Sequence, residues 1–154
     1  MITFKQYLNE VRIENWSFSK DHSDSIAKSD DIRGRKWKVL PLKNPFPVKG
    51  FSIKYDREPL GFYGIAVIDD KTKNVAVYLD AKTTKLKFSG GTITGLMTYQ
   101  LSSAKEYRGQ DLTVHLYDTL VANGQILISS ANQTRGGASV WDRLVKQTKQ
   151  HVLV

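Results

Sequence analysis

The stretch TYQLSSAKEYRGQDLTVHLYDTLVANGQILISS, residues 98–130, decides the expected fold. It opens with a strand-like run and closes with a short apolar run, QILISS, that also predicts a strand. Between the two runs the apolar residues recur at helical spacing, and Gly124 is placed to end the helix. The residues on one helical face are Leu112, Leu116, Leu120 and Val121. A strand, a helix and a strand in this order predict two neighbouring parallel strands, with the helix covering one face of the sheet.

The flanking segments extend this pattern in both directions. FYGIAVIDDKTKNVAVYLD, residues 62–80, consists of two strand-like runs around a polar turn and predicts a β-hairpin. The β-rich texture continues to residue 103, and GGASVWDRLVKQTKQ, residues 136–150, predicts a second helix before a last short strand, HVLV. The apolar side of that second helix would hold Val140, Trp141, Leu144 and Val145. We therefore expect an α+β fold in residues 59–154, a mixed and mainly antiparallel sheet with flanking helices.

The first 58 residues have a different composition. MITFKQYLNEVR, residues 1–12, has apolar residues at helical spacing and predicts a short amphipathic helix. Residues 13–58 predict a polar and basic arm that extends from the domain. Its first part, residues 17–35, is rich in Ser and Asp and indicates a loop or a poorly ordered segment. Residues 38–51 hold three prolines and predict an extended, irregular segment that lies on the domain.

Composition excludes several classes of function. The 154 residues suit one domain, and the absence of cysteine excludes disulfides, thiolate metal sites and a cysteine nucleophile. The three histidines are far apart and lack the spacing of metal ligands. No apolar run approaches the roughly 20 residues of a membrane span, and no secretory signal is evident at the N-terminus. These features predict a soluble, intracellular protein that does not bind membranes.

The formal net charge is +8, and the excess is uneven. Residues 32–54 contain seven Lys and Arg residues and no acid. Such an excess attracts anions, which include nucleic acid, acidic protein surfaces and phosphorylated cofactors, although a solvated charged face is the simpler interpretation. The candidate contacts to nucleic acid are Arg33, Arg35, Lys36 and Lys38.

The 98–130 stretch resembles the central segment of the GNAT family of N-acetyltransferases. In that family a strand leads into an Arg/Gln-x-x-Gly-x-Gly/Ala loop and then a helix, and the loop amides hold the diphosphate of coenzyme A. The resemblance covers roughly residues 60–150 and implies that this chain binds acetyl-CoA. The cofactor-binding residues that it implies are Ser102, Ser103, Arg108, Gly109, Gln110, Asp111, Leu112 and Thr113. Within this set, Ser102 and Ser103 stand where a bulged strand would offer an amide to the acetyl carbonyl.

The chain departs from the family pattern at three positions. Asp111 and Thr113 occupy the two small positions of the loop, and Asp111 would place a carboxylate beside two phosphate charges. Without a phosphate, Asp111 is a natural cap for the following helix. Trp141 stands where the family often has a tyrosine acid, and indole cannot serve as an acid. The remaining candidates for the base are Glu106 and His115, with Asp118 as a weaker alternative. The candidates for the acid are Tyr117 and Tyr107.

Two further features resemble phage proteins. ILISSANQTRGGASVWDRLVK, residues 126–146, is similar to a phage-encoded branch of the GNAT fold. MITFKQYLNE resembles the capsid-targeting leader of internal head proteins of T-even-like phages, which implies cleavage after Glu10 of Leu8-Asn9-Glu10. An ordinary N-terminal helix that packs on the domain is the alternative. A leader would imply packaging in the virion head and injection into the host.

Two hypotheses follow from these features. The first is a phage-type acetyl-CoA-dependent N-acetyltransferase whose acceptor is a host protein or a small amine. The second is a cofactor-less GNAT-like binding protein that inhibits a host protein or binds nucleic acid through the basic arm. Either would act in the host cytoplasm. The retained YRGQ of residues 107–110 favours the first hypothesis, whereas Asp111, Thr113 and Trp141 favour the second.

Overall fold

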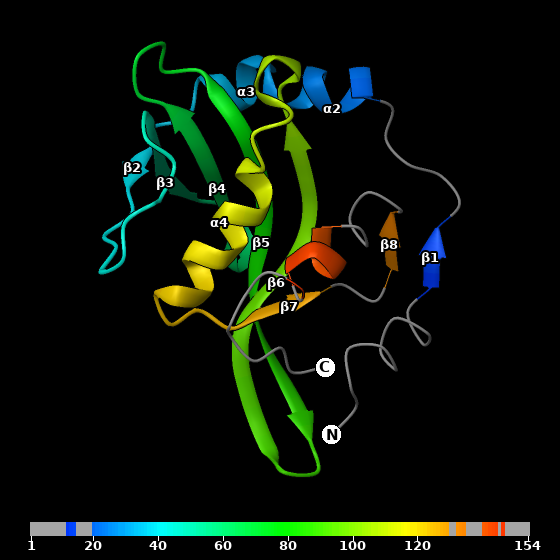
Figure 1. The fold of residues 1–154 in the computed structure, drawn as a ribbon. Coiled ribbons are helices and arrows are strands. Elements are labelled where there is room, and N and C mark those ends of the chain that lie inside the picture. The colour runs from blue at the N-terminus through cyan, green and yellow to red at the C-terminus, as the bar shows by residue number, and fades with distance from the viewer. Residues whose placement is uncertain (1–11, 15–19, 130–131, 135–139, 145, 147–154) are drawn as a thin grey trace.

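The computed structural model describes residues 12–14, 20–129, 132–134, 140–144 and 146. Its main feature is a six-stranded sheet with the strand order β2-β3-β4-β5-β6-β7 (Figure 1). Neighbouring strands are antiparallel except β6 and β7, which are parallel. The strands are β2 (Lys38–Val39), β3 (Phe51–Arg57), β4 (Phe62–Asp69), β5 (Val75–Phe88), β6 (Gly91–Ser103) and β7 (Leu127–Ser129). The predicted α+β class, with a mixed and mainly antiparallel sheet, agrees with this arrangement.

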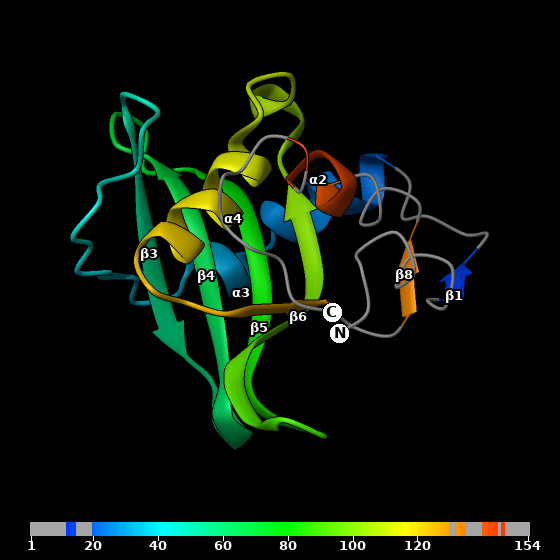
Figure 2. The ribbon, with the colours of Figure 1, turned by 60° about the horizontal axis from the view of Figure 1, so that its bottom comes forward.

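Helices cover both faces of the sheet (Figure 2). The helix α4 (Leu112–Ala122) lies on one face, and α2 (Lys20–Ala27) and α3 (Asp30–Arg33) lie on the other. Successive side chains of β4 alternate between the two faces, since Ile65 and Val67 join the α4 core while Ala66 and Ile68 pack with Ile32 of α3. The short 3₁₀ segments η1 (Pro59–Gly61) and η2 (Lys105–Tyr107) precede β4 and α4.

The predicted strand–helix–strand unit is confirmed. Leu96 to Thr98 of β6 pair in parallel with Leu127 to Ser129 of β7, and α4 connects the two strands. The helix ends as predicted at Gly124, whose φ of 90° is favourable for glycine. The Gln125 N–H donates to Leu120 O at 3.0 Å and the Gly124 N–H donates to Val121 O at 3.0 Å, the pair of bonds that defines a Schellman cap.

The prediction of a loop over residues 17–35 is wrong for its described part, because α2 and α3 lie there. Two features outweigh the polar composition. Ser29 caps α3 by accepting the Ile32 N–H, and acidic residues occupy the first turn of that helix. Ala27 and Ile32 are buried against the sheet, so tertiary packing stabilises helices that are too short to persist alone.

The predicted arm, residues 13–58, contains two strands of the six-stranded sheet, β2 and β3. β3 pairs with β4 over its full length, from Phe51 opposite Asp69 to Arg57 opposite Tyr63. The irregular segment before β3 does lie on the domain, as predicted, and its apolar side chains pack against the α4 core. Asn44 fastens it to the end of α4, since its Nδ2 donates to Ala122 O at 2.9 Å.

Two parts of the fold lie near the chain ends. β1 (Arg12–Glu14) and β8 (Asn132–Thr134) form a separate parallel pair that the sequence did not predict. Residues 140–144 are helical, in agreement with the predicted second helix, and Trp141 and Leu144 are buried in the α4 core. The predicted helix over residues 1–12, the cleavage site at Leu8-Asn9-Glu10 and the last strand HVLV fall outside the described residues, apart from Arg12 in β1.

Gly95 permits the close approach of β7, and its replacement by alanine should destabilise the protein. A Cβ at Gly95 would lie 2.5 Å from Ile126 O, the atom that accepts the Leu96 N–H. We expect Gly95→Ala to lower the free energy of unfolding by about 1–3 kcal/mol, the usual cost of overpacking. Urea unfolding followed by circular dichroism measures this change. Thr94→Ala, at an exposed neighbour, is the control, and equal stability of the two variants would contradict the prediction.

Candidate functional site

The loop between β6 and α4 contains two residues in left-handed backbone conformations. Gly109 has a φ of 86° and Asp111 has a φ of 55°. The Asp111 carbonyl accepts the His115 N–H at 3.0 Å and so begins α4, but the Asp111 side chain makes no capping hydrogen bond. The prediction that this carboxylate caps the helix is therefore wrong. The Asp111 carboxylate accepts no hydrogen bond from the N–H groups at the beginning of α4.

Asp111 is held instead by an arginine from the C-terminal helix. Its carboxylate forms an ion pair with the Arg143 guanidinium, and the two side chains are 49% and 41% exposed. The contact matters because a carboxylate next to a phosphate costs about 4 kcal/mol at ~4 Å and an effective dielectric of about 20. The Arg143 charge offsets that repulsion, and exposure of both side chains to water reduces it further.

A cleft of about 150 Å³ opens at the beginning of α4. Its walls contain six of the eight predicted cofactor residues together with Arg143 and Val140 of the C-terminal helix. The six are Ser103, Arg108, Gly109, Asp111, Leu112 and Thr113. The other two, Ser102 and Gln110, do not line the cleft. Ser102 is buried together with its hydroxyl group. The cleft therefore combines the positive end of a helix with two arginines, one of which pairs with Asp111. A helix N-terminus with arginines beside it is the chemistry of an anion site.

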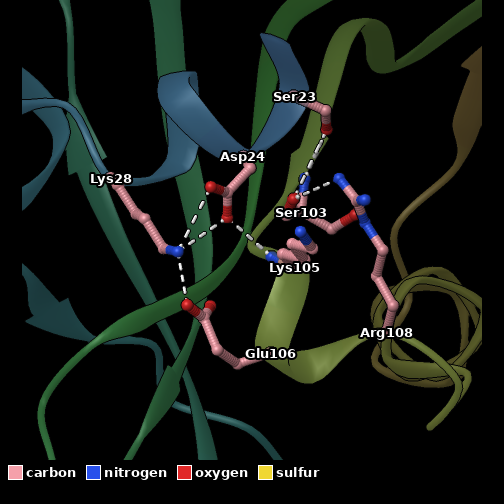
Figure 3. Close-up of polar contacts among 7 residues, drawn as sticks. All are labelled: Ser23, Asp24, Lys28, Ser103, Lys105, Glu106 and Arg108. Carbon is pink, nitrogen blue, oxygen red and sulfur yellow. Dashed lines mark hydrogen bonds and ion pairs between the residues drawn. The ribbon is translucent and has the colours of Figure 1, made fainter. Parts of the chain in front are cut away.

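The helix α2 is fastened to the residues before the cleft (Figure 3). The Ser103 N–H donates to Ser23 Oγ at 2.9 Å, and the Lys105 N–H donates to an Asp24 carboxylate oxygen at 2.7 Å. This backbone hydrogen bond, followed by the one from the Lys28 side chain, lowers the pKa of Asp24. Arg108 completes the group by donating from Nη2 to Ser103 O at 3.2 Å. The contacts join α2 to the end of β6 through backbone atoms.

These contacts bear on the role that the resemblance implies for the Ser103 amide. The Ser103 amide already donates to Ser23, so it cannot also donate to an acetyl carbonyl in this arrangement. The bulge in β6 lies at Tyr99 instead, because Asp80 pairs with Gln100 while Ala81 pairs with Thr98. This bulge directly follows Thr98, the last β6 residue that pairs with β7.

Of the predicted catalytic residues, Glu106, His115 and Tyr117 are not among those that line the cleft. Glu106 forms an ion pair with Lys28, which lowers the pKa of Glu106 and makes it a weaker base. Tyr117 is 3% exposed, and burial raises its pKa, which makes it a weaker acid. His115 packs edge-on against Phe46 of the arm at 6.5 Å between ring centroids. Trp141 is a core residue that packs against Tyr117 at 5.4 Å between ring centroids.

The four basic residues predicted to contact nucleic acid differ in their exposure to solvent. Arg33, Lys36 and Lys38 are exposed, as a charged binding face requires. Arg35 is not available to such a partner, because its guanidinium pairs with Glu58 and Asp31 and lies over the Tyr78 ring at 5.1 Å. These contacts hold the Arg35 side chain beside Glu58 and Tyr78.

Sequence reasoning missed a second and larger cavity, of about 400 Å³, on the face of the sheet that α2 and α3 cover. Glu58 accepts a hydrogen bond from the Tyr78 hydroxyl at 2.8 Å, and Asp80 lies nearby on the same strand as Tyr78. Burial, followed by the charge of Glu58, raises the pKa of Asp80 to about 6. The one sequence signal was a carboxylate, Asp80, inside the apolar run VAVYLDA.

Asp80 should make stability depend on pH. Its pKa is higher in the folded protein than the ordinary value of 3.8, so the folded protein binds more protons and stability falls as pH rises from about 4 to about 6. We expect Asp80→Asn to remove this decline and to be more stable than the natural protein by about 1 kcal/mol at pH 7.5, a figure reduced for solvent exposure. Thermal unfolding between pH 4 and pH 8 measures it. Asp118→Asn on α4 controls for the lost charge, and parallel pH profiles for the natural protein and Asp80→Asn would contradict the prediction.

Comparison with known proteins adds no identification. No protein-family model matches the chain, and no curated protein matches it. In the described part of the chain, no group of three or more His, Asp and Glu side chains is placed to hold a metal ion. No helix within the described ranges is long and apolar enough to cross a bilayer.

Proposed function

We propose that this chain is a phage-type GNAT-like protein that binds acetyl-CoA and transfers its acetyl group to an amine of the host. The observation that carries the proposal is the orientation of Asp111, whose carboxylate pairs with Arg143 and leaves the helix amides uncapped by its side chain. The diphosphate of the cofactor would lie in the cleft at the beginning of α4, between Arg108 and Arg143.

The size of the cleft is consistent with this role. At about 150 Å³ it is smaller than the roughly 300–1,000 Å³ of sites that enclose a whole small ligand. The diphosphate alone would lie inside, and the rest of the cofactor would extend over the surface. The left-handed Gly109 lets the backbone approach the phosphates without a side chain in between.

The topology gives a second line of support. The sheet changes from antiparallel to parallel across the loop and α4, and β6 runs on for five residues, 99–103, beyond its last pair with β7. The bulge at Tyr99 lies at this point of separation. A cofactor held at the α4 N-terminus would extend from the cleft toward the bulge. Bound acetyl-CoA supplies the thioester whose acetyl group an amine attacks.

Calorimetric titration with acetyl-CoA tests the proposal. The natural protein should release or absorb heat on binding, Arg108→Glu should bind at least ~10-fold more weakly, and Asp111→Gly should bind more tightly because a carboxylate is removed. Arg57→Glu, at an exposed position on β3, carries the same charge change and should bind as the natural protein does. Absence of binding heat with acetyl-CoA in both the natural protein and Asp111→Gly would overturn the proposal.

A second function is favoured by one observation at the end of β6. Ser23 of α2 already accepts the Ser103 N–H, which is an amide that an acetyl carbonyl would need. A protein that binds no cofactor has no need of this amide, so the contact favours a docking function. Such a protein would bind nucleic acid through Arg33, Lys36 and Lys38. Fluorescence anisotropy with duplex DNA at two salt concentrations separates the functions. Salt-sensitive DNA binding that falls in a Lys36→Glu, Lys38→Glu variant, with no binding of acetyl-CoA, would support the docking protein.

A further inference from the structure

We propose that the cavity between the α2–α3 pair and the sheet binds a small alkyldiammonium ligand, with Asp80 as the principal contact to one ammonium group. The cavity lies on the face of the sheet opposite α4, so it is separate from the cleft at the α4 N-terminus. Its volume of about 400 Å³ falls in the range of small-ligand sites. The inference does not depend on acetyl-CoA binding.

The charges around the cavity leave an excess of negative charge. Three carboxylates, those of Asp31, Glu58 and Asp80, line it together with one cation, Arg35. Arg35 is paired with Glu58 and with Asp31. With Asp80 ionised, the lining carries two surplus negative charges. A ligand with two positive charges would neutralise them.

In the lining, Asp80 has one carboxylate oxygen that is left without a hydrogen bond from any described residue. Its Oδ1 is buried and has no hydrogen-bond partner within the described part of the protein. A buried carboxylate oxygen without a donor is costly, because the desolvation of the group is not compensated. An ammonium group has three N–H donors and a positive charge, so it would satisfy both deficits.

The rest of the network is already fixed in position. The Tyr78 hydroxyl donates to Glu58 at 2.8 Å, and Arg35 stacks on the Tyr78 ring. Gly64 makes this possible, since a Cβ there would lie 2.7 Å from the Arg35 guanidinium and 3.1 Å from the Tyr78 ring. Arg35 is therefore held by Glu58 and Asp31, and its charge offsets only part of the effect that burial and Glu58 have on Asp80. The site therefore has side chains already held in position on one side, and the Asp80 carboxylate is available to a ligand.

The apolar part of the lining favours an alkyl ligand over an inorganic cation. Ile26 and Ile32 line the cavity beside the carboxylates and would contact methylene groups. Gln100 and Ser29 add neutral polar atoms for a second ammonium group. No metal-binding cluster is found among the described residues, whereas a chain of methylenes between two ammonium groups matches a wall that is partly apolar and partly acidic.

Calorimetric titration with 1,4-diaminobutane at pH 7.5 and low ionic strength tests the inference. The natural protein should bind the diamine, and 1,4-butanediol, its neutral counterpart of equal length, should give no heat. Asp80→Asn should weaken diamine binding by at least ~10-fold, or about 1.4 kcal/mol. Asp118→Asn removes a carboxylate from α4, outside the cavity, and should bind as the natural protein does.

A second titration at pH 5 provides an independent readout. At pH 5, protonation of Asp80 should weaken the binding of the diamine, although the diamine itself keeps both positive charges. The charged and titratable groups around Asp80 are Glu58, Arg35, Tyr78 and Asp31. Chemical shifts of the Gln100 side-chain amide should move on binding at pH 7.5. Absence of diamine binding, equal affinity in Asp80→Asn, equal binding of the diol, or an unmoved Gln100 amide would each overturn the inference. All of these measurements use the protein without acetyl-CoA, so their failure would leave the proposed acetyltransferase function untouched.

Discussion

Replacing Arg143 with glutamate is expected to weaken the binding of coenzyme A by at least ~100-fold. Arg143 lies in the wall of the cleft and is the cation that pairs with Asp111. The substitution removes one attraction to the diphosphate and releases the Asp111 carboxylate next to it. It also adds a second carboxylate. Each like-charge contact at a partly exposed site costs on the order of 1–4 kcal/mol, so two decades of affinity is a conservative expectation.

Lys146→Glu is the matched control for this experiment. Lys146 follows Arg143 by three residues, is 71% exposed and pairs with Asp142. Its reversal changes the net charge by the same amount, and Lys146 is not among the residues that line the cleft. Calorimetry on both variants therefore separates a local contact from the general effect of charge. Equal losses in the two variants would show that Arg143 does not contact the diphosphate.

Replacing Trp141 with alanine is expected to lower the free energy of unfolding by about 3–5 kcal/mol, the usual range for a large aromatic residue removed from a core. Trp141 is 5% exposed, and its ring lies 5.4 Å from that of Tyr117 on α4. Its removal would leave a cavity between α4 and the C-terminal helix, and it would weaken the support of Arg143.

Urea unfolding followed by circular dichroism at 222 nm measures the loss for Trp141→Ala. Val39→Ala is the control, since Val39 is apolar but 72% exposed, and it should change stability by less than about 0.5 kcal/mol. A loss below about 1 kcal/mol for Trp141→Ala would mean that the C-terminal helix does not pack on α4 as described.

The sheet and α4 were predictable because their signals are local. Two short apolar runs around a polar turn marked β4 and β5, and helical spacing with a glycine stop marked α4. The helices α2 and α3 were missed because their stability comes from a few buried contacts, such as Ile32, inside a polar stretch. β3 was missed because its residues were assigned to the polar and basic arm, residues 13–58.

The cleft was predictable in part, and the reason is also physical. Its loop residues are neighbours in sequence, so the resemblance of a short motif located most of them. Arg143 comes from 32 residues beyond Asp111, and no local pattern predicts that contact. Among the predicted catalysts, His115 and Tyr117 are two residues apart on one helix and therefore point in different directions. Glu106 was drawn to Lys28, a partner 78 residues away.

The central claim is that the amides at the beginning of α4 hold the diphosphate of coenzyme A. Titration of the ¹⁵N-labelled protein with coenzyme A, followed by backbone amide chemical shifts, tests it directly. We expect the largest shifts at Gly109 and at residues 112–114, and we expect these shifts to disappear in Arg143→Glu. Unmoved amides at these positions in the presence of saturating coenzyme A, or shifts confined to the basic residues Arg33, Lys36 and Lys38, would contradict it.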